Sequence, residues 1–264
     1  MTRSVTILGC SSSGGVPRVG QGWGKCDPAN PKNRRRRCSI LISQENSGQL
    51  TNVLVDTSPD LREQLIDAEV KRLDAILYTH PHADHTHGVD DVRGLVILNG
   101  RRIPAYMDEP TSRMMTTKFD YIFETPPGSF YPPLLTEHRL HLGRPTFLDG
   151  AGGTLEATPF RLEHGEMDAL GFRIGDMAYT PDLHAIPPES VQYLEGLDLW
   201  IIDALRHQRH GSHLSVSQAF EWIERLKPRR AVLTDLHVDL DYDALSAICP
   251  PNVTPAYDGM QIAL

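Results

Sequence analysis

The sequence lacks the features that mark exported, membrane-spanning and disulfide-stabilised proteins. Among 264 residues there are only four cysteines, and none of them forms a C-x-x-C pair, which argues against a disulfide framework and fits a reducing compartment. The N-terminus has one arginine and a short apolar stretch, unlike a signal peptide. No apolar run approaches the ~20 residues that span a bilayer. These absences predict a soluble, cytoplasmic protein with no membrane partner.

Positive charge is also scarce. Lysine and arginine together number 26 against 34 aspartates and glutamates, which gives a formal net charge of −8. A negative net charge argues against a protein whose main function is to bind the nucleic-acid backbone, so no stable nucleic-acid partner is expected. The run Arg34–Arg37 stands out against this background. It is interpreted as a solvated surface patch, or alternatively as a guide for phosphate-bearing substrates.

Short β-branched runs bounded by glycine, proline, serine and aspartate predict the strands. They are 5–8, 39–42, 52–55, 75–78, 154–160, 171–174, 199–202, 231–233 and 261–264. Apolar residues at helical spacing predict helices over 59–68 and 215–226, the second after a run of possible capping residues.

The order of these elements predicts one domain over residues 1–264. No internal repeat or low-complexity tract divides the chain, and its strands come first and then alternate with helices. This order is typical of the α/β (α+β) class, with two packed sheets and helices outside. The segment 109–142 mixes helical residues with four prolines and is predicted to be an insertion that rims the site.

The strongest functional signal is the run Thr79-His80-Pro81-His82-Ala83-Asp84-His85, directly after the predicted strand 75–78. Burying so many polar groups without partners would cost several kcal/mol. At a strand-to-loop turn they can instead converge on metal, with His80 and His82 facing one ion and Asp84 and His85 a second. Imidazole suits zinc, iron and manganese, and an added carboxylate favours harder ions.

This H-x-H-x-D-H motif after a strand resembles the signature of the metallo-β-lactamase superfamily. The chain looks like the phosphodiesterase branch of that family, which includes tRNase Z and the phosphoribosyl 1,2-cyclic phosphate phosphodiesterase. The likeness runs from the first strand to the closing Asp258-Gly259-Met260. It implies a metallo-β-lactamase αββα sandwich of two mixed sheets.

The resemblance also implies the remaining metal ligands. His164, in a loop after a central strand, would complete the first site, and Asp182 in Thr180-Pro181-Asp182 would bridge the two ions. Many relatives place the last histidine directly after a threonine, where this chain has Asp235. His237 is predicted as that ligand, because a two-residue shift keeps a side chain on the same face of an extended segment. Asp235 remains the alternative.

Two further parts of the site follow from the same likeness. His213, just before the helix from Ser215, resembles the histidine that acts at the phosphate as general acid or transition-state stabiliser. Asp84 is assigned a catalytic role besides its metal contact. The loop from Gly9 to Pro17 is rich in small residues that let backbone N–H groups approach an anion. Its predicted substrate-binding residues are Ser11, Ser12, Ser13 and Gly14, and a tight turn beside the site is the other interpretation.

These residues predict a dinuclear-metal hydrolase that cleaves a small phosphodiester, cyclic or nucleotide-like. Two divalent ions, zinc or manganese, would activate the attacking water. The expected partners are the small-molecule substrate and, from the resemblance, a second copy of the chain in a homodimer. One alternative is a thioester or lactone hydrolase of the same fold, which the presence of His213 disfavours. Another is a tRNA 3′-processing endonuclease, which the negative net charge disfavours. Outside enzymes, the alternative is a metal or nucleotide sensor.

Overall fold

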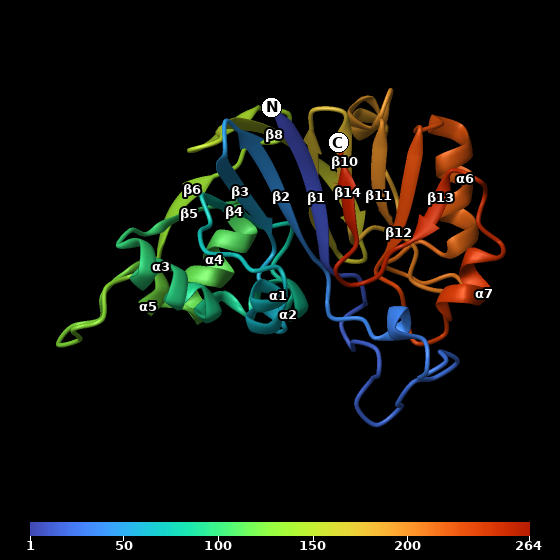
Figure 1. Cartoon of the computed structure of the whole chain (residues 1–264), viewed down its shortest axis with the longest axis horizontal. Helices are drawn as coiled ribbons and strands as arrows, with labels where there is room; N and C mark the ends of the chain where they lie inside the picture. Colours follow the sequence, from blue (N-terminus) through green and yellow to red (C-terminus); the bar gives the residue numbers. More distant parts are fainter.

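The computed structural model describes all residues 1–264, which form two seven-stranded β-sheets with helices on the outer faces (Figure 1). The first sheet has the order β14–β1–β2–β3–β4–β5–β6. Its strands are β1 (Thr2–Gly9), β2 (Ser39–Asn46), β3 (Gln49–Val55), β4 (Ala75–Leu77), β5 (Ile103–Met107), β6 (Leu135–Arg139) and β14 (Gln261–Ala263). The pairs from β14 to β3 are antiparallel and those from β3 to β6 are parallel.

The second sheet has the order β13–β12–β11–β10–β9–β8–β7. Its strands are β7 (Thr146–Gly150), β8 (Gly153–His164), β9 (Met167–Ile174), β10 (Met177–Thr180), β11 (Leu199–Asp203), β12 (Arg230–Thr234) and β13 (Val253–Pro255). The pairs from β10 to β13 are parallel and the remaining pairs are antiparallel. Both sheets are therefore mixed.

A single apolar layer lies between the two sheets. Alternate residues of β1, including Val5 and Ile7, pack with Phe172 of β9 and Ile201 of β11, and all four are inaccessible to solvent. Alternation of this kind is expected where one face of a strand meets a core. Burial of these side chains supplies the main force that holds the sheets together.

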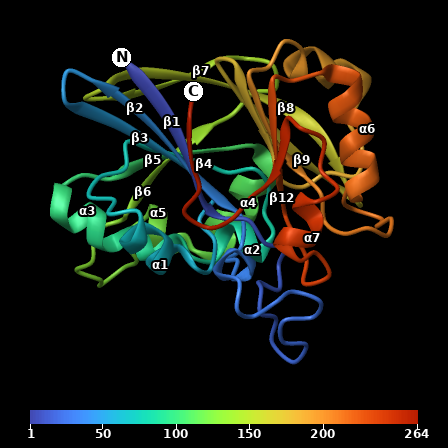
Figure 2. The same cartoon turned by 45° about the vertical axis from the view of Figure 1, so that its right-hand side comes forward.

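Helices cover the two outer faces (Figure 2). The first sheet carries α1 (Leu61–Asp67), α3 (Arg93–Asn99), α4 (Glu109–Lys118) and α5 (Asp120–Phe123), and the second carries α6 (Val216–Leu226) and α7 (Tyr242–Ser246). The start of α6 is fixed by a capping box, in which the Ser215 and Gln218 side chains satisfy each other's backbone N–H groups. No helix combines the length and apolar character that a membrane crossing needs.

The predicted αββα sandwich is confirmed, and every predicted strand and both predicted helices overlap an observed element. The prediction missed β5, β6, β7, β10 and β13, which are short or carry polar residues. Segment 109–142 is not wholly an insertion, because its residues Leu135–Arg139 form β6 and pair in parallel with β5. Between α4 and α5, the Phe119 ring lies 5.5 Å from that of His87, two residues after the motif run.

The carboxyl ends of the central strands share one edge of the sandwich. The loop 10–38, which follows β1, projects from this edge, as does α2 (Ala83–Thr86), whereas both chain termini lie at the opposite edge (Figures 1 and 2). Polar residues that follow β4, β8, β10, β11 and β12 are therefore brought to one place.

Candidate metal centre

Six of the predicted site residues form one compact cluster at this edge. The ligand atoms of His80, His82 and His164 lie within 4.8 Å of one another, and so do those of His80, His85 and Asp182. A further group of the same size joins His164 and Asp182 to His213. Because His80, His164 and Asp182 each belong to two groups, the cluster is continuous, as a pair of neighbouring cation sites requires.

Buried partners orient the imidazoles of this cluster. His85 Nδ1 lies 2.7 Å from Asp56 Oδ2, and Asp56 also accepts hydrogen bonds from the backbone and hydroxyl of Thr79. His164 Nδ1 lies 2.7 Å from the carbonyl oxygen of Ser212. With their Nδ1 protons donated in this way, His85 and His164 present Nε2 lone pairs to the cluster, an arrangement common among metal ligands. The sequence prediction missed Asp56.

The chemistry of the donor set fits divalent cations. His85 Nε2 and Asp182 Oδ1, 3.2 Å apart, are both buried without a hydrogen-bond partner. Burial disfavours the Asp182 carboxylate, but the neighbouring His85 and His80 outweigh it and hold the pKa of Asp182 well below its usual range. Burial lowers the pKa of His80 well below the usual value. Burial would lower the pKa of His85, but Asp182 and Asp56 outweigh it and raise this pKa well above its usual value, so a cation bound here would displace a proton from the ring. Imidazoles around an ionised carboxylate are the ligands that zinc and manganese take.

His82 and Asp84 lie on the exposed side of this cluster. His82 Nδ1 is 2.9 Å from His80 Nε2 and 3.3 Å from His164 Nε2. Asp84 Oδ2 is 3.6 Å from His85 Nε2, at the start of α2. The structure therefore places both residues beside the cluster, where they remain predicted ligands.

His213 is held between two buried carboxylates. Its Nδ1 lies 3.0 Å from an oxygen of Asp203 and 3.0 Å from an oxygen of Asp235, while its Nε2 is 3.9 Å from Asp182 Oδ2. Burial would lower the pKa of His213, but Asp203 and Asp235 outweigh it and raise the pKa to about 12. His213 is therefore a cation that directs an N–H group towards the cluster. Asp203, at the end of β11, was not predicted from the sequence.

The structure does not bring His237 to the cluster. Its Nε2 is 2.7 Å from Arg18 Nη1 and its Nδ1 is 3.0 Å from Asp239 Oδ2. The prediction that His237 would replace a ligand two residues earlier is wrong, because β12 ends at Thr234 and Asp235 has a left-handed φ of 59°. The segment is therefore not extended, and alternate residues do not share a face. Asp235, the alternative, lies beside His213 and the metal cluster instead.

The N-terminal loop contacts the segment after β12. Ser11 donates its hydroxyl to the Leu236 carbonyl and its N–H to the Arg36 carbonyl, so this residue is occupied by structural contacts. The N–H groups of Ser12, Ser13 and Gly14 donate to no protein acceptor. Those three groups are the part of the predicted substrate-binding loop that can receive an anion.

Three of the four residues in the run Arg34–Arg37 hold the loop in place. Arg35 is 1% exposed and donates to the Leu240 carbonyl, Arg36 pairs with Asp258 and Asp67, and Arg37 pairs with Asp60. Only Arg34 is exposed without a carboxylate partner. The run is therefore neither a solvated patch nor a free guide for phosphate, because most of its charge is committed within the fold.

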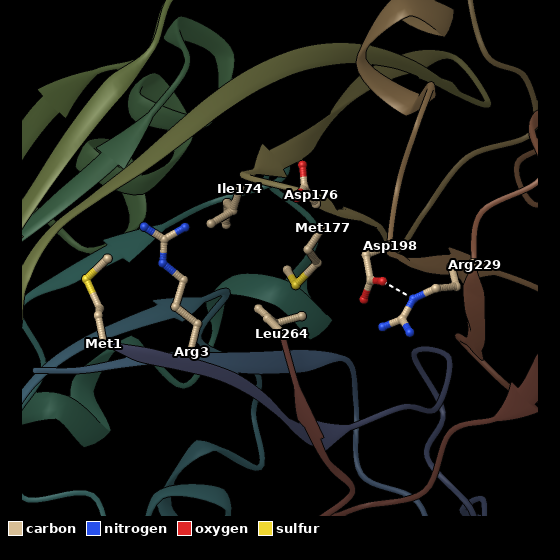
Figure 3. Close-up of a pocket in the computed structure, with 8 residues that line it drawn as sticks. All are labelled: Met1, Arg3, Ile174, Asp176, Met177, Asp198, Arg229 and Leu264. Carbon is tan, nitrogen blue, oxygen red and sulfur yellow. Dashed lines mark hydrogen bonds and ion pairs between the residues drawn. The ribbon is translucent and has the colours of Figure 1, made fainter.

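A separate cavity of about 340 Å³ lies at the opposite edge of the sandwich (Figure 3). Met1, Arg3 and Leu264 line it together with the ion pair between Asp198 and Arg229. It contains none of the predicted site residues, since Asp198 and Arg229 precede the strands β11 and β12 whose far ends carry the cluster.

The fold and the cluster define the chain as a metallo-hydrolase of the αββα class. The model of the β-lactamase superfamily domain matches residues 51–235, which include every ligand of the cluster. The chain belongs to this metallo-β-lactamase superfamily and is a metal-dependent hydrolase.

Individual relatives cover nearly the whole chain. A crystal structure of a diphosphatase from the PhnP family superimposes with a TM-score of 0.87 at 34% identity, covering 100% of this chain and 98% of that one. The short form of human tRNase Z superimposes with a TM-score of 0.63 at 18% identity, covering 98% of each chain, a likeness of fold alone.

A protein of Porphyromonas gingivalis named octanoyltransferase is 32% identical over 260 residues. This match covers 97% of the present chain and 50% of that protein. The chain therefore spans half the length of this relative.

Proposed function

We propose that the protein is a phosphodiesterase that uses two divalent cations to hydrolyse a small cyclic or nucleotide-like phosphodiester. The observation that carries the proposal is the placement of His213, whose cationic ring faces Asp182 at the edge of the metal-ligand cluster. A fixed cation at this place offsets charge that develops on phosphoryl oxygens during cleavage. The similarity to a diphosphatase supports hydrolysis at a phosphorus centre.

The residues of the cluster would divide between two cations. His80, His82 and His164 would hold the first and Asp84 and His85 the second, with Asp182 between them. Two bound zinc or manganese ions would polarise the phosphoryl group and lower the pKa of an attacking water. Asp235 belongs with Asp203 and His213, since its Oδ2 lies 3.0 Å from His213 Nδ1.

His213 serves the leaving group. Attack of water on phosphorus breaks the bond to an alkoxide, which needs a proton as it departs. Because Asp203 and Asp235 hold Nδ1, the proton on Nε2 is the one that faces the substrate. His213 donates this proton to the alkoxide, or donates a hydrogen bond to the phosphoryl oxygens before it does so.

An acyl-transfer function receives less support from the site. Cys10 and Cys38 lie near the cluster, but burial raises the pKa of each thiol well above its usual value. Buried thiols of this kind are poor nucleophiles. A thioester or lactone hydrolase would use the metal ligands, yet it would leave the His213, Asp203 and Asp235 arrangement without an evident task.

The proposal is tested with a substrate panel on the purified full chain. Bis(p-nitrophenyl) phosphate, a ribose cyclic phosphate, a thioester and a lactone are supplied with manganese or with zinc, and hydrolysis rates are compared. We expect cleavage of the phosphodiesters and negligible cleavage of the thioester and the lactone. Cleavage of the thioester without any phosphodiester would overturn the proposal.

A further inference from the structure

The cavity at the edge opposite the metal centre, which we call the far-edge cavity, lies where the two sheets meet. Arg3 enters it from β1 of the first sheet, whereas Ile174 and Met177 enter it from β9 and β10 of the second. Ile174 is 3% exposed and Met177 is 1% exposed. With Leu264 they give the cavity an aliphatic surface (Figure 3).

Arg3 brings an uncompensated positive charge to this cavity. Its Nε donates a hydrogen bond of 2.7 Å to the Oε1 atom of Gln44, a buried residue whose amide is held by the Gly152 carbonyl. Arg229 pairs with Asp198, whereas Arg3 forms no ion pair. Because a guanidinium has five N–H donors, four of them remain in the planar fork that binds carboxylates.

Asp176 brings an uncompensated negative charge close to this guanidinium. It lies in the turn between β9 and β10, is exposed and forms no ion pair. An added Cβ at Gly175 would lie 3.2 Å from Arg3 Nη1, so the guanidinium lies beside the turn that carries Asp176. Figure 3 shows Ile174 between the Arg3 guanidinium and the Asp176 carboxylate. Charges of both signs therefore lie next to an aliphatic surface.

The other two charges of the cavity cancel each other. Hydrogen bonds from Arg229 and Arg230 lower the pKa of Asp198 to about 2, so this carboxylate stays ionised and paired. Arg3 and Asp176 are left, and the charges that line the cavity sum to zero. A phosphate dianion would be repelled by the two carboxylates. Electrostatic complementarity favours a ligand that carries one charge of each sign.

We propose that the far-edge cavity binds a small zwitterion with an aliphatic side chain, namely an apolar α-amino acid. Its carboxylate binds Arg3, its ammonium group faces Asp176, and its side chain packs on Ile174 and Met177. Ligand pockets span about 300–1,000 Å³, so a cavity of about 340 Å³ fits a molecule of this size. The site lies at the edge opposite the metal centre, and the inference does not depend on the proposed phosphodiesterase function.

The first experiment follows the methyl group of Met177 by NMR in the full chain labelled with [methyl-¹³C]methionine. Met177→Leu assigns its signal among the seven methionines, and Met107 and Met115, buried elsewhere, are internal references. Leucine, isoleucine and valine are titrated, and the tightest ligand is compared with its deaminated and decarboxylated analogues. We expect a saturable shift of the Met177 signal, and dissociation constants about tenfold or more higher for each analogue, since each loses one charged contact. No shift with any of the three amino acids, or an analogue that binds as tightly, would overturn the zwitterion site.

The second experiment assigns each charged group of the ligand to its residue. Arg3→Met keeps the aliphatic stem, Asp176→Asn keeps the shape of the side chain, and Arg34→Met is the matched control at an exposed arginine outside the cavity. Arg3→Met and Asp176→Asn should each raise the dissociation constant of the amino acid about tenfold or more, and the control should keep the wild-type value. The decarboxylated analogue should respond to Asp176→Asn but not to Arg3→Met. Unchanged constants in either cavity variant, or an equal loss in the control, would refute the assignment, and the Met107 and Met115 signals verify that each variant is folded.

Discussion

At the scale of single residues, the site depends on carboxylates that fix the protonation of their neighbours. Asp56 orients His85, and Asp203 with Asp235 surrounds Nδ1 of His213. Charge-assisted contacts of this kind are strong when buried, because little water competes for the ions. Their effect is to leave one defined nitrogen of each ring facing the substrate or the metal.

Replacement of His213 by alanine should reduce turnover by roughly 10²–10⁴-fold, because the leaving alkoxide would lose its proton donor. Steady-state kinetics with a ribose cyclic phosphate, whose leaving group is an alkoxide, measures this effect, and metal content should be unchanged. His207→Ala is the control, since His207 is exposed in the same segment. A variant of His213 that changes KM alone would contradict the assigned role.

Asp182→Asn and His237→Ala should differ in bound metal. Asp182 is 2% exposed and lies beside both His80 and His85, so the loss of its charge should remove most of the metal. His237 lies with Arg18 and Asp239, so His237→Ala should keep the wild-type content. Plasma mass spectrometry after gel filtration in manganese or zinc gives the comparison. Loss of metal in the His237 variant would show that the histidine is a ligand after all.

At the scale of elements, close backbone approach positions the ligand-bearing turn. Gly88 follows α2 and its N–H donates to the Thr57 carbonyl, which brings α2 against the segment that contains Asp56. A Cβ at Gly88 would collide with the Ser58 carbonyl oxygen. The position therefore needs glycine for space rather than for an unusual backbone conformation, since its φ is −90°.

Gly88→Ala should lower the free energy of unfolding by about 1–3 kcal/mol, the usual cost of overpacking. Gly94→Ala is a matched control because Gly94 lies in α3 with nothing within 4 Å of an added Cβ. This control should be neutral or stabilising by up to about 1 kcal/mol, since alanine favours helix. Urea denaturation of the metal-free proteins measures both, and equal midpoints would refute the steric argument.

At the scale of the whole molecule, the cluster exists only when the sandwich is assembled. His80 and His85 come from the first sheet, whereas His164, Asp182 and His213 come from the second. Cations bound between them would act as links between the two halves of the fold. Since an unfolded chain cannot hold these groups together, such cations would stabilise the folded state.

Chelation should therefore lower the melting temperature. Cations at 100 times their dissociation constant stabilise a folded protein by about 2.7 kcal/mol, and differential scanning calorimetry with and without a chelator would detect the loss. Asp182→Asn should show little difference between the two conditions. An unchanged wild-type melting curve would argue that the folded chain holds no cation at this cluster.

Local patterns in the sequence determined the fold class and most of the cluster. Short β-branched runs bounded by turn residues identified strands of both sheets, and the run His80–His85 placed four candidate ligand groups on the turn and helix after one of these strands. The order of His164 and Asp182 along the chain matched the family. The strands and the motif run could be predicted because strand-forming runs and short-range spacing depend on neighbouring residues alone, whereas His164 and Asp182 were implied by the family resemblance.

Tertiary structure alone decided between Asp235 and His237 and added Asp56 and Asp203. The left-handed backbone at Asp235 turns the chain after β12, which sends Asp235 to His213 and His237 to Arg18. Asp56 and Asp203 acquire their roles from residues 29 and 10 positions away in the sequence. A single sequence does not encode such contacts as a local pattern, because they depend on one backbone torsion and on how two sheets pack.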